Sequence, residues 1–213
     1  MNERPVLLLG AGGHAQVILA MLKDKGYQIV GVSAPELKSE SYWNGIRVIG
    51  DDNDVLAFAP QKVILANGVG VVAGGKLRSI VHARFMDNNY DFVSLMHSSA
   101  VVDASVELAA GVQIMAGAVV QPKCRIDAGV VVNTGAIIDH DCWLSSRSFI
   151  GPGVTLCGGV CIEEDVFVGA GAVVLPGINI GKRAVVGAGA VVTRSVKCDA
   201  MVVGNPAKCM SGI

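Results

Sequence analysis

The chain has 213 residues, with 17 lysines and arginines against 18 aspartates and glutamates, and 52% of its residues are hydrophobic. A nearly neutral chain with this apolar content can bury a sizeable core, which excludes a disordered chain and a coiled coil. It also lacks the excess of positive charge that nucleic-acid-binding proteins carry. No stretch approaches the roughly 20 uninterrupted apolar residues of a membrane-spanning helix, so we expect a soluble protein.

The N-terminal part predicts a small α/β domain over residues 1–85. A run of four apolar residues, 6–9, is followed by the glycine-rich segment GAGGHA at 10–15 and by an amphipathic helix from Gln16 to about Lys25. Further strands are expected at residues 27–32 and 62–66, which gives the βαβαβ order of half a doubly wound nucleotide-binding fold. The first apolar run is short and ends in glycines, so we interpret it as a strand instead of a signal peptide and place the protein in the cytoplasm.

The glycine-rich segment is a candidate phosphate site. It opens a helix, so its backbone N–H groups and the helix dipole favour a bound anion. A full dinucleotide site needs about twice this length and an acidic residue after the second strand, where this chain has Ser33-Ala34-Pro35. A nucleoside diphosphate therefore fits better than NAD, and dehydrogenase activity is disfavoured. His14 stands at the mouth of the loop, where it either contacts the ligand or faces water.

Beyond residue 85 an aliphatic residue recurs every six positions. The series runs from Val102 to Val192 without a break, and its sixteen members are all Ile, Leu or Val. Glycine stands three positions later at nine of the turns, and a small or β-branched residue follows it. Three six-residue sides make a triangular coil of 18 residues, and stacked coils pair as parallel strands. The pattern predicts about five coils over residues 86–213.

The cysteines and histidines do not predict a metal site. Six cysteines form no CxxC pair, so we interpret them as reduced structural thiols, and Cys124 and Cys142, 18 residues apart, are expected to stack in the interior. Four histidines are present, of which His140 lies in the repeat. A zinc site of three histidines, as in γ-carbonic-anhydrase-like proteins on such a scaffold, cannot be built from one histidine per chain.

His140 is the candidate general base. It follows the inward-facing Ile138 by two positions, at a corner of a coil, and Asp141 is placed to hold Nδ1–H and leave Nε2 free. An ordinary surface histidine among carboxylates is the alternative from this segment alone. Eighteen residues on, Gly158 leaves room for a thioester and offers an N–H to a developing oxyanion. Cations gather near the end of this column, and the candidate contacts to the phosphates of coenzyme A are Lys182, Arg183, Arg194 and Lys197.

Four features together resemble the nucleotide-amino-sugar N-acetyltransferases of the sialic-acid O-acetyltransferase-like, hexapeptide-repeat family. They are GAGGHA after the first strand, the hexads, NTGAIIDHDC at residues 133–142 and VGNPAK at residues 203–208. The resemblance covers nearly the whole chain. It implies a Rossmann-like domain that binds a UDP-, dTDP- or GDP-linked 4-amino-sugar, a left-handed parallel β-helix, and a homotrimer with acetyl-CoA between two subunits. It also implies a place in lipopolysaccharide or O-antigen biosynthesis.

The resemblance assigns roles to individual residues. It implies that His140 is the catalytic base, Asp141 its orienting carboxylate and Gly158 the oxyanion donor. The implied acetyl-CoA contacts are Asn133, Phe149, Gly158, Ala170, Ala188 and Arg194, and the implied nucleotide-sugar contacts are Gly10, Gly12, Gly13, His14, Ser33 and Asn67. Two positions depart from the family pattern: Phe149 stands where a second histidine is frequent, and Ser33-Ala34 stands where an acidic pair is frequent.

The sequence and the resemblance together predict acetyl transfer from acetyl-CoA to the C4 amine of a nucleotide-linked amino-deoxysugar. The amine attacks the thioester directly, so no covalent intermediate on a cysteine is needed. Two alternatives stay open. One is O-acetylation of a sugar hydroxyl, and the other is a non-catalytic trimer that binds a nucleotide sugar, which Phe149 in place of the family's histidine keeps open.

Overall fold

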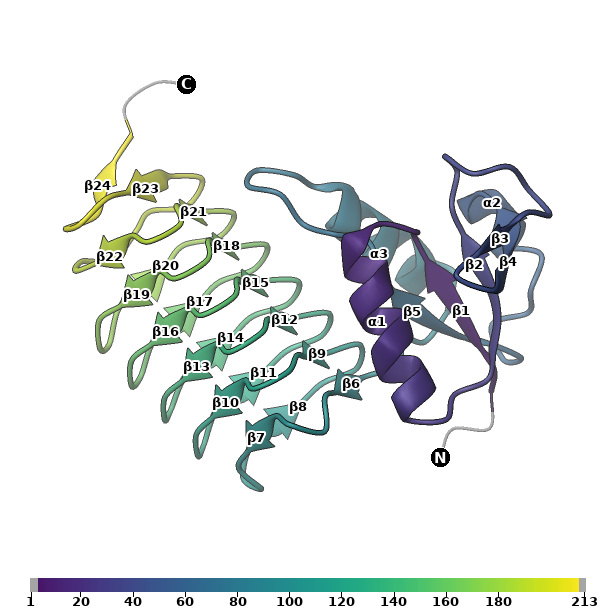
Figure 1. Cartoon of the computed structure of the whole chain (residues 1–213). Helices are drawn as coiled ribbons and strands as arrows, with labels where there is room; N and C mark the ends of the chain where they lie inside the picture. The colour runs from purple at the N-terminus through teal and green to yellow at the C-terminus, as the bar shows by residue number, and fades with distance from the viewer. Residues whose placement is uncertain (1–3, 211–213) are drawn as a thin grey trace. The chain divides into compact units, whose positions relative to one another are not determined.

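The computed structural model describes residues 4–210 and divides the chain into two compact units, one up to Leu95 and one from Met96 onwards (Figure 1). The boundary that the sequence places after residue 85 falls inside α3 (Leu77–Asp87), a helix that the periodicity did not predict. None of the helices in the described part of the chain is long and apolar enough to cross a membrane.

The first unit is an α/β domain built on one five-stranded sheet. Its strands are β1 (Val6–Leu9), β2 (Ile29–Ser33), β3 (Tyr42–Trp43), β4 (Ile46–Gly50) and β5 (Ile64–Asn67), in the order β3-β4-β2-β1-β5. All neighbours pair in parallel except β3, which is antiparallel to β4. Its helices are α1 (Gly13–Asp24), α2 (Asp52–Val55) and α3. The four residues of β1 are completely buried, as expected of a central parallel strand.

Besides α3, the start of α1 and the segment between β2 and β5 differ from the sequence-based prediction. Helix α1 begins at Gly13, three residues before the predicted Gln16, because the glycine loop leads directly into the first turn with Gly12 as the N-cap. Strands β3 and β4 were missed. Asn44 and Gly45 between them both have positive φ, 48° and 81°. An Asn-Gly pair that closes a tight hairpin is a strong signal that the sequence analysis overlooked.

The second unit is a parallel β-helix with three sides (Figure 1). The strands of the first side are β7 (Val101–Val102), β10 (Val119–Val120), β13 (Ile137–Ile138), β16 (Thr155–Leu156), β19 (Val173–Val174) and β22 (Val191–Val192). Those of the second side are β8 (Glu107–Leu108), β11 (Arg125–Ile126), β14 (Trp143–Leu144), β17 (Cys161–Ile162) and β20 (Asn179–Ile180). Those of the third side are β6 (Leu95–Met96), β9 (Gln113–Ile114), β12 (Val131–Val132), β15 (Phe149–Ile150), β18 (Phe167–Val168), β21 (Val185–Val186), β23 (Met201–Val203) and β24 (Lys208–Cys209).

The register within the β-helix agrees with the predicted coil length. Ile138 lies beside Leu156 and Leu144 beside Ile162, both pairs being 18 residues apart. The hexad residues from Ile114 onwards are buried in one continuous core. Leu108 is the exception to the predicted inward series, because it is 39% exposed. It stands on β8, the terminal strand of its sheet, where no preceding coil covers it.

The turns have the backbone conformation that the glycine pattern predicts. The nine hexad glycines have φ between 64° and 72°. Asp141 occupies the same turn position with φ of 57°, although side chains rarely adopt this conformation and the next coil has Gly159 there. Lys123, Arg147, Asp165 and Arg183 occupy the same turn position in other coils with φ between 57° and 61°, so the turn accepts side chains as well as glycine.

Two stacked thiols lie beneath this corner. Cys124 and Cys142 are buried, as predicted, and all six cysteines are free thiols in the structure. The sulfur of Cys124 donates to the carbonyl oxygen of Asp139 at 3.0 Å, and that of Cys142 donates to the carbonyl oxygen of Cys157 at 3.3 Å. The first contact ties the backbone directly before His140 to Cys124, and the second ties Cys142 to the backbone of the next coil.

Candidate functional site

His140 lies in the corner between β13 and β14, where the turn exposes its ring. Its Nδ1 is 2.7 Å from Oδ2 of Asp141, and its backbone N–H donates to Oδ1 of Asp139 at 2.8 Å. With the Nδ1 proton donated to this carboxylate, the neutral ring carries its lone pair on Nε2. Nε2 has no hydrogen-bond partner among residues 4–210. The corner therefore presents an oriented, unoccupied base to solvent.

The imidazole of His140 lies over Gly158 of the next coil. A Cβ atom on Gly158 would approach Cε1 and Nε2 of the ring to 2.7 Å, closer than real side chains pack. The N–H of Gly158 donates no hydrogen bond to any part of the chain that the structure describes. A backbone amide with no acceptor within residues 4–210 thus lies beside the candidate base.

The carboxylates around His140 change its affinity for a proton. The hydrogen bond that His140 donates to Asp141, followed by the charge of Asp139, raises the pKa of His140 above its ordinary value of 6.5. The ring is exposed, so burial opposes this effect only weakly. A base with a raised pKa needs a higher pH to become neutral and active.

This geometry predicts a pH dependence. kcat/KM should rise with pH as His140 loses its proton, with a midpoint above 6.5. Asp141→Asn removes the charge and should shift this midpoint to lower pH, and its maximal rate should fall because the ring loses its orientation. Asparagine suits the left-handed backbone at this turn, and Asp141→Gly, which suits it equally, is the matched variant. If the rise of kcat/KM with pH keeps the same midpoint in both variants, the assignment of His140 as the base is contradicted.

The acetyl-CoA contacts expected at Ala170 and Ala188 lie on a different edge of the β-helix from His140. Ala170 and Ala188 are exposed in the corner between the third and the first side, one coil apart, and neither backbone N–H is used within residues 4–210. Asn133 lies on the same edge in an earlier coil, and its Oδ1 accepts from the N–H of Thr134 at 2.7 Å. A single chain therefore does not bring His140 together with Asn133, Ala170 and Ala188.

Phe149 also lies apart from His140, on the third side of the β-helix. It is 9% exposed and stacks on Phe167 of the next coil, with ring centroids 5.3 Å apart and planes within 3°. The structure gives this side chain a packing role. A histidine at this position would place a polar ring against Phe167.

Two of the four predicted cations are already paired. Nζ of Lys182 is 2.8 Å from Glu164, and Nε of Arg183 is 2.6 Å from Asp199. Arg194 and Lys197 are exposed and make no ion pair within the described residues. These two are the cations that remain available to phosphate groups.

The glycine loop of the first domain has the geometry of an anion site. Gly10 has φ of 87°, and its N–H donates to the carbonyl oxygen of Ser33 at 2.7 Å. Gly12 and Gly13 are exposed at the start of α1, with no atom within 4 Å of the place of a Cβ. His14 is half-buried beside Gly70, which follows β5. The loop can receive a phosphate at the positive end of a 12-residue helix.

Ser33 and Asn67 both end strands of this domain, and both are buried. Oγ of Ser33 donates to Oδ1 of Asp52 at 2.6 Å. Oδ1 of Asn67 accepts from the N–H of Val69 at 3.1 Å, and the guanidinium of Arg78 donates to the Asn67 carbonyl oxygen at 3.0 Å. Burial lowers the pKa of Arg78 to about 9. Asn67 thus shapes the loop after β5.

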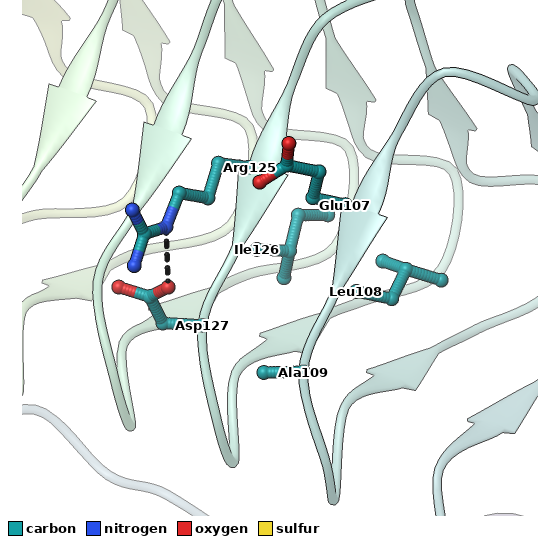
Figure 2. Close-up of a pocket in the computed structure, with 6 residues that line it drawn as sticks. All are labelled: Glu107, Leu108, Ala109, Arg125, Ile126 and Asp127. Carbon is teal, nitrogen blue, oxygen red and sulfur yellow. Dashed lines mark hydrogen bonds and ion pairs between the residues drawn. The ribbon is translucent and has the colours of Figure 1, made fainter.

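A hollow of about 340 Å³ lies on the second side of the β-helix, lined by Glu107, Leu108, Ala109, Arg125, Ile126 and Asp127 (Figure 2). Nε of Arg125 is paired with Oδ1 of Asp127 at 2.9 Å, and the indole of Trp143 donates to the other oxygen of that carboxylate at 2.9 Å. Arg125 and Asp127 are thus paired with each other on this exposed side, and we assign the hollow no catalytic role. Within residues 4–210 no group of three His, Cys, Asp or Glu side chains could hold a metal ion.

Comparisons with known proteins cover both domains. Residues 5–73 match the PglD N-terminal domain, and residues 159–194 match the hexapeptide repeat of succinyl-transferase. No curated protein sequence matches the chain. A mutant of perosamine N-acetyltransferase from Caulobacter crescentus, solved with CoA and GDP-perosamine, is 33% identical, with a TM-score of 0.90 over 99% of this chain and 98% of that one.

The chain belongs to the hexapeptide-repeat nucleotide-sugar N-acetyltransferases. A second similar structure is the acetyltransferase domain of PglB from Neisseria gonorrhoeae with acetyl coenzyme A, which is 30% identical, with a TM-score of 0.87 over 97% of this chain and 99% of that one. This membership confirms three predictions: a Rossmann-like domain followed by a left-handed β-helix, acyltransferase activity, and acetyl-CoA as co-substrate.

In this N-acetyltransferase the structure shows two acidic residues, hydrogen-bonded to candidate site residues, that the sequence analysis did not name. Asp139 holds the backbone of His140, and its place directly before the histidine was visible in the sequence. Asp52, just after β4, accepts a hydrogen bond from Ser33 at the end of β2. The signal for Asp52 was an acidic segment after β4, but β4 itself was missed.

Proposed function

We propose that the protein transfers the acetyl group of acetyl-CoA to the C4 amine of a nucleotide-linked amino-deoxysugar, with His140 as general base. The observation that carries the proposal is the corner of the β-helix where Asp141 orients His140 and Nε2 stays free beside Gly158. Similar proteins support the substrate class, since one was solved with CoA and GDP-perosamine. A role in lipopolysaccharide or O-antigen biosynthesis and a cytoplasmic location accord with this substrate.

The reaction needs no covalent intermediate on the protein. The amine nitrogen attacks the thioester carbonyl carbon and forms the C–N bond, while Nε2 of His140 accepts the amine proton. The N–H of Gly158 stabilises the negative oxygen of the tetrahedral intermediate. The C–S bond then breaks, and the proton held by His140 passes to the departing thiolate. Asp141 stabilises the imidazolium between these two steps.

A homotrimer would complete this site. His140 and the edge of Asn133, Ala170 and Ala188 lie on different corners of one chain, so acetyl-CoA meets both only if a neighbouring copy supplies one of them. Ile137 and Trp143, on the strands flanking His140, are 44% and 45% exposed, which fits a surface that another copy covers. Each of the three sites would then lie between two subunits.

The test is coenzyme A release, followed with a thiol reagent. Acetyl-CoA is mixed with UDP-, dTDP- and GDP-linked 4-amino-sugars and with the corresponding 4-hydroxy-sugars. We expect release with one amino-sugar and none with its hydroxy counterpart. Release with the hydroxy-sugar only would replace the proposal with O-acetylation. If no member of the panel releases coenzyme A, the assignment as an acetyltransferase of nucleotide sugars is refuted.

A further inference from the structure

The carboxyl ends of β1, β2 and β4 lie at one edge of the sheet in the first domain, because these strands run in parallel. β1 leads into the glycine loop, β2 ends at Ser33, and β4 ends at Gly50, just before Asp52. In doubly wound sheets a nucleotide binds outside this edge, with its phosphates at the first loop and its ribose towards the next strand.

Hydrogen bonds connect these three strand ends. The N–H of Gly10 donates to the carbonyl oxygen of Ser33 at 2.7 Å, and the N–H of Ala34 donates to the carbonyl oxygen of Gly50 at 2.8 Å. The Ser33 side chain is completely buried and donates to Oδ1 of Asp52 at 2.6 Å. The Asp52 carboxylate is therefore held against the end of β2, the strand that follows the phosphate loop.

The neighbouring acids have other tasks. Asp51 caps α2, with its two oxygens accepting from the backbone and the side chain of Asn53. Oδ2 of Asp54 accepts from the N–H of Asp51 at 2.8 Å. Asp52 is half-exposed, and its Oδ2 accepts no hydrogen bond from residues 4–210. Of these three carboxylates, that of Asp52 is oriented by a buried donor and keeps one oxygen available.

We propose that Asp52, positioned by Ser33, accepts a hydrogen bond from the ribose 2′-hydroxyl of the nucleotide sugar. Asp52, at the start of α2 just after β4, then supplies the carboxylate that is missing after β2, where Ser33 and Ala34 stand. The consequence is a choice among nucleotides: UDP and GDP have the 2′-hydroxyl, and dTDP lacks it. The inference rests on the proposed function, and it makes the acceptor substrate a ribonucleoside diphosphate sugar.

Calorimetry on the full chain tests this assignment with GDP, UDP, their 2′-deoxy forms and dTDP. We expect GDP or UDP to bind the wild-type protein about 10- to 100-fold more tightly than its 2′-deoxy form, the range for a hydrogen bond to a charged group. Asp52→Ala should bring this ratio close to one, and Ser33→Ala should reduce it in part. Asp24→Asn is the charge-matched control, because Asp24 ends α1, roughly 18 Å along the helix from the loop.

Three outcomes would overturn the assignment: equal affinity of the wild-type protein for the ribo and deoxy forms, an unchanged ratio in folded Asp52→Ala and Ser33→Ala, or no binding of GDP and UDP. Melting curves identify a variant that fails to fold, in which case the other variant decides. The coenzyme A assay separates this inference from the proposed function. Acetyl transfer without ribose discrimination refutes the role of Asp52 alone, whereas discrimination by Asp52 without acetyl transfer refutes the proposed function alone.

Discussion

Replacing His140 with alanine is expected to lower kcat by about 10²- to 10⁴-fold, the contribution of a positioned general base. The ring is exposed and contributes nothing to the core, so the melting temperature should change little. His140→Asn should give a similar loss, because an amide keeps a polar group at the corner but does not accept the amine proton.

The measurement is steady-state coenzyme A release at saturating substrates, with a melting curve for each variant. His97→Ala is the matched control, because His97 is the other histidine of the second unit and its Nδ1 contacts only Ser99 within residues 4–210, at 2.8 Å. Turnover at the wild-type level in a folded His140→Ala protein would refute the assignment of the base.

Gly158→Ala is expected to have the second-largest effect, a loss in kcat of about 10²-fold or more. The added methyl group would lie 2.7 Å from Cε1 and Nε2 of His140, so the ring must rotate away from the position that Asp141 sets. The exposed ring can move without disturbing the core, so the variant should fold. Pro176→Ala, at the same turn position one coil further on, is the control.

The double variant His140→Ala/Gly158→Ala shows how the methyl group acts. If its effect is to displace His140, the double variant should be no slower than His140→Ala alone, because the two losses share one cause. Losses that multiply in the double variant would contradict displacement, and would mean that the methyl group obstructs the thioester or the oxyanion directly.

The β-helix could be predicted from the sequence almost residue by residue. Each coil repeats the same environment every 18 residues, so inward residues such as Ile138 and Leu156 carry their position in the local pattern. The pattern failed at Leu108, because it takes no account of the end of the stack. In the first domain the hairpin of β3 and β4 was missed, and with it the acidic segment after β4.

The candidate site could be predicted in part. His140 and Asp141 are adjacent in the sequence, and the coil length places Gly158 beside them, so this cluster follows from spacing. The role of Asp139 in holding the His140 backbone depended on side-chain orientation, which spacing does not give. The sequence also did not reveal that Lys182 and Arg183 are paired, which leaves Arg194 and Lys197 as the available cations.

The sequence by itself determined the repeat, the β-helix, the glycine loop and the histidine corner of this N-acetyltransferase, because each depends on contacts at a fixed or short separation along the chain. Only the tertiary structure decided that Asp52 accepts a hydrogen bond from Ser33, since that contact depends on β4 pairing beside β2. The order of strands in a sheet is set by packing between distant segments, and no local pattern records it.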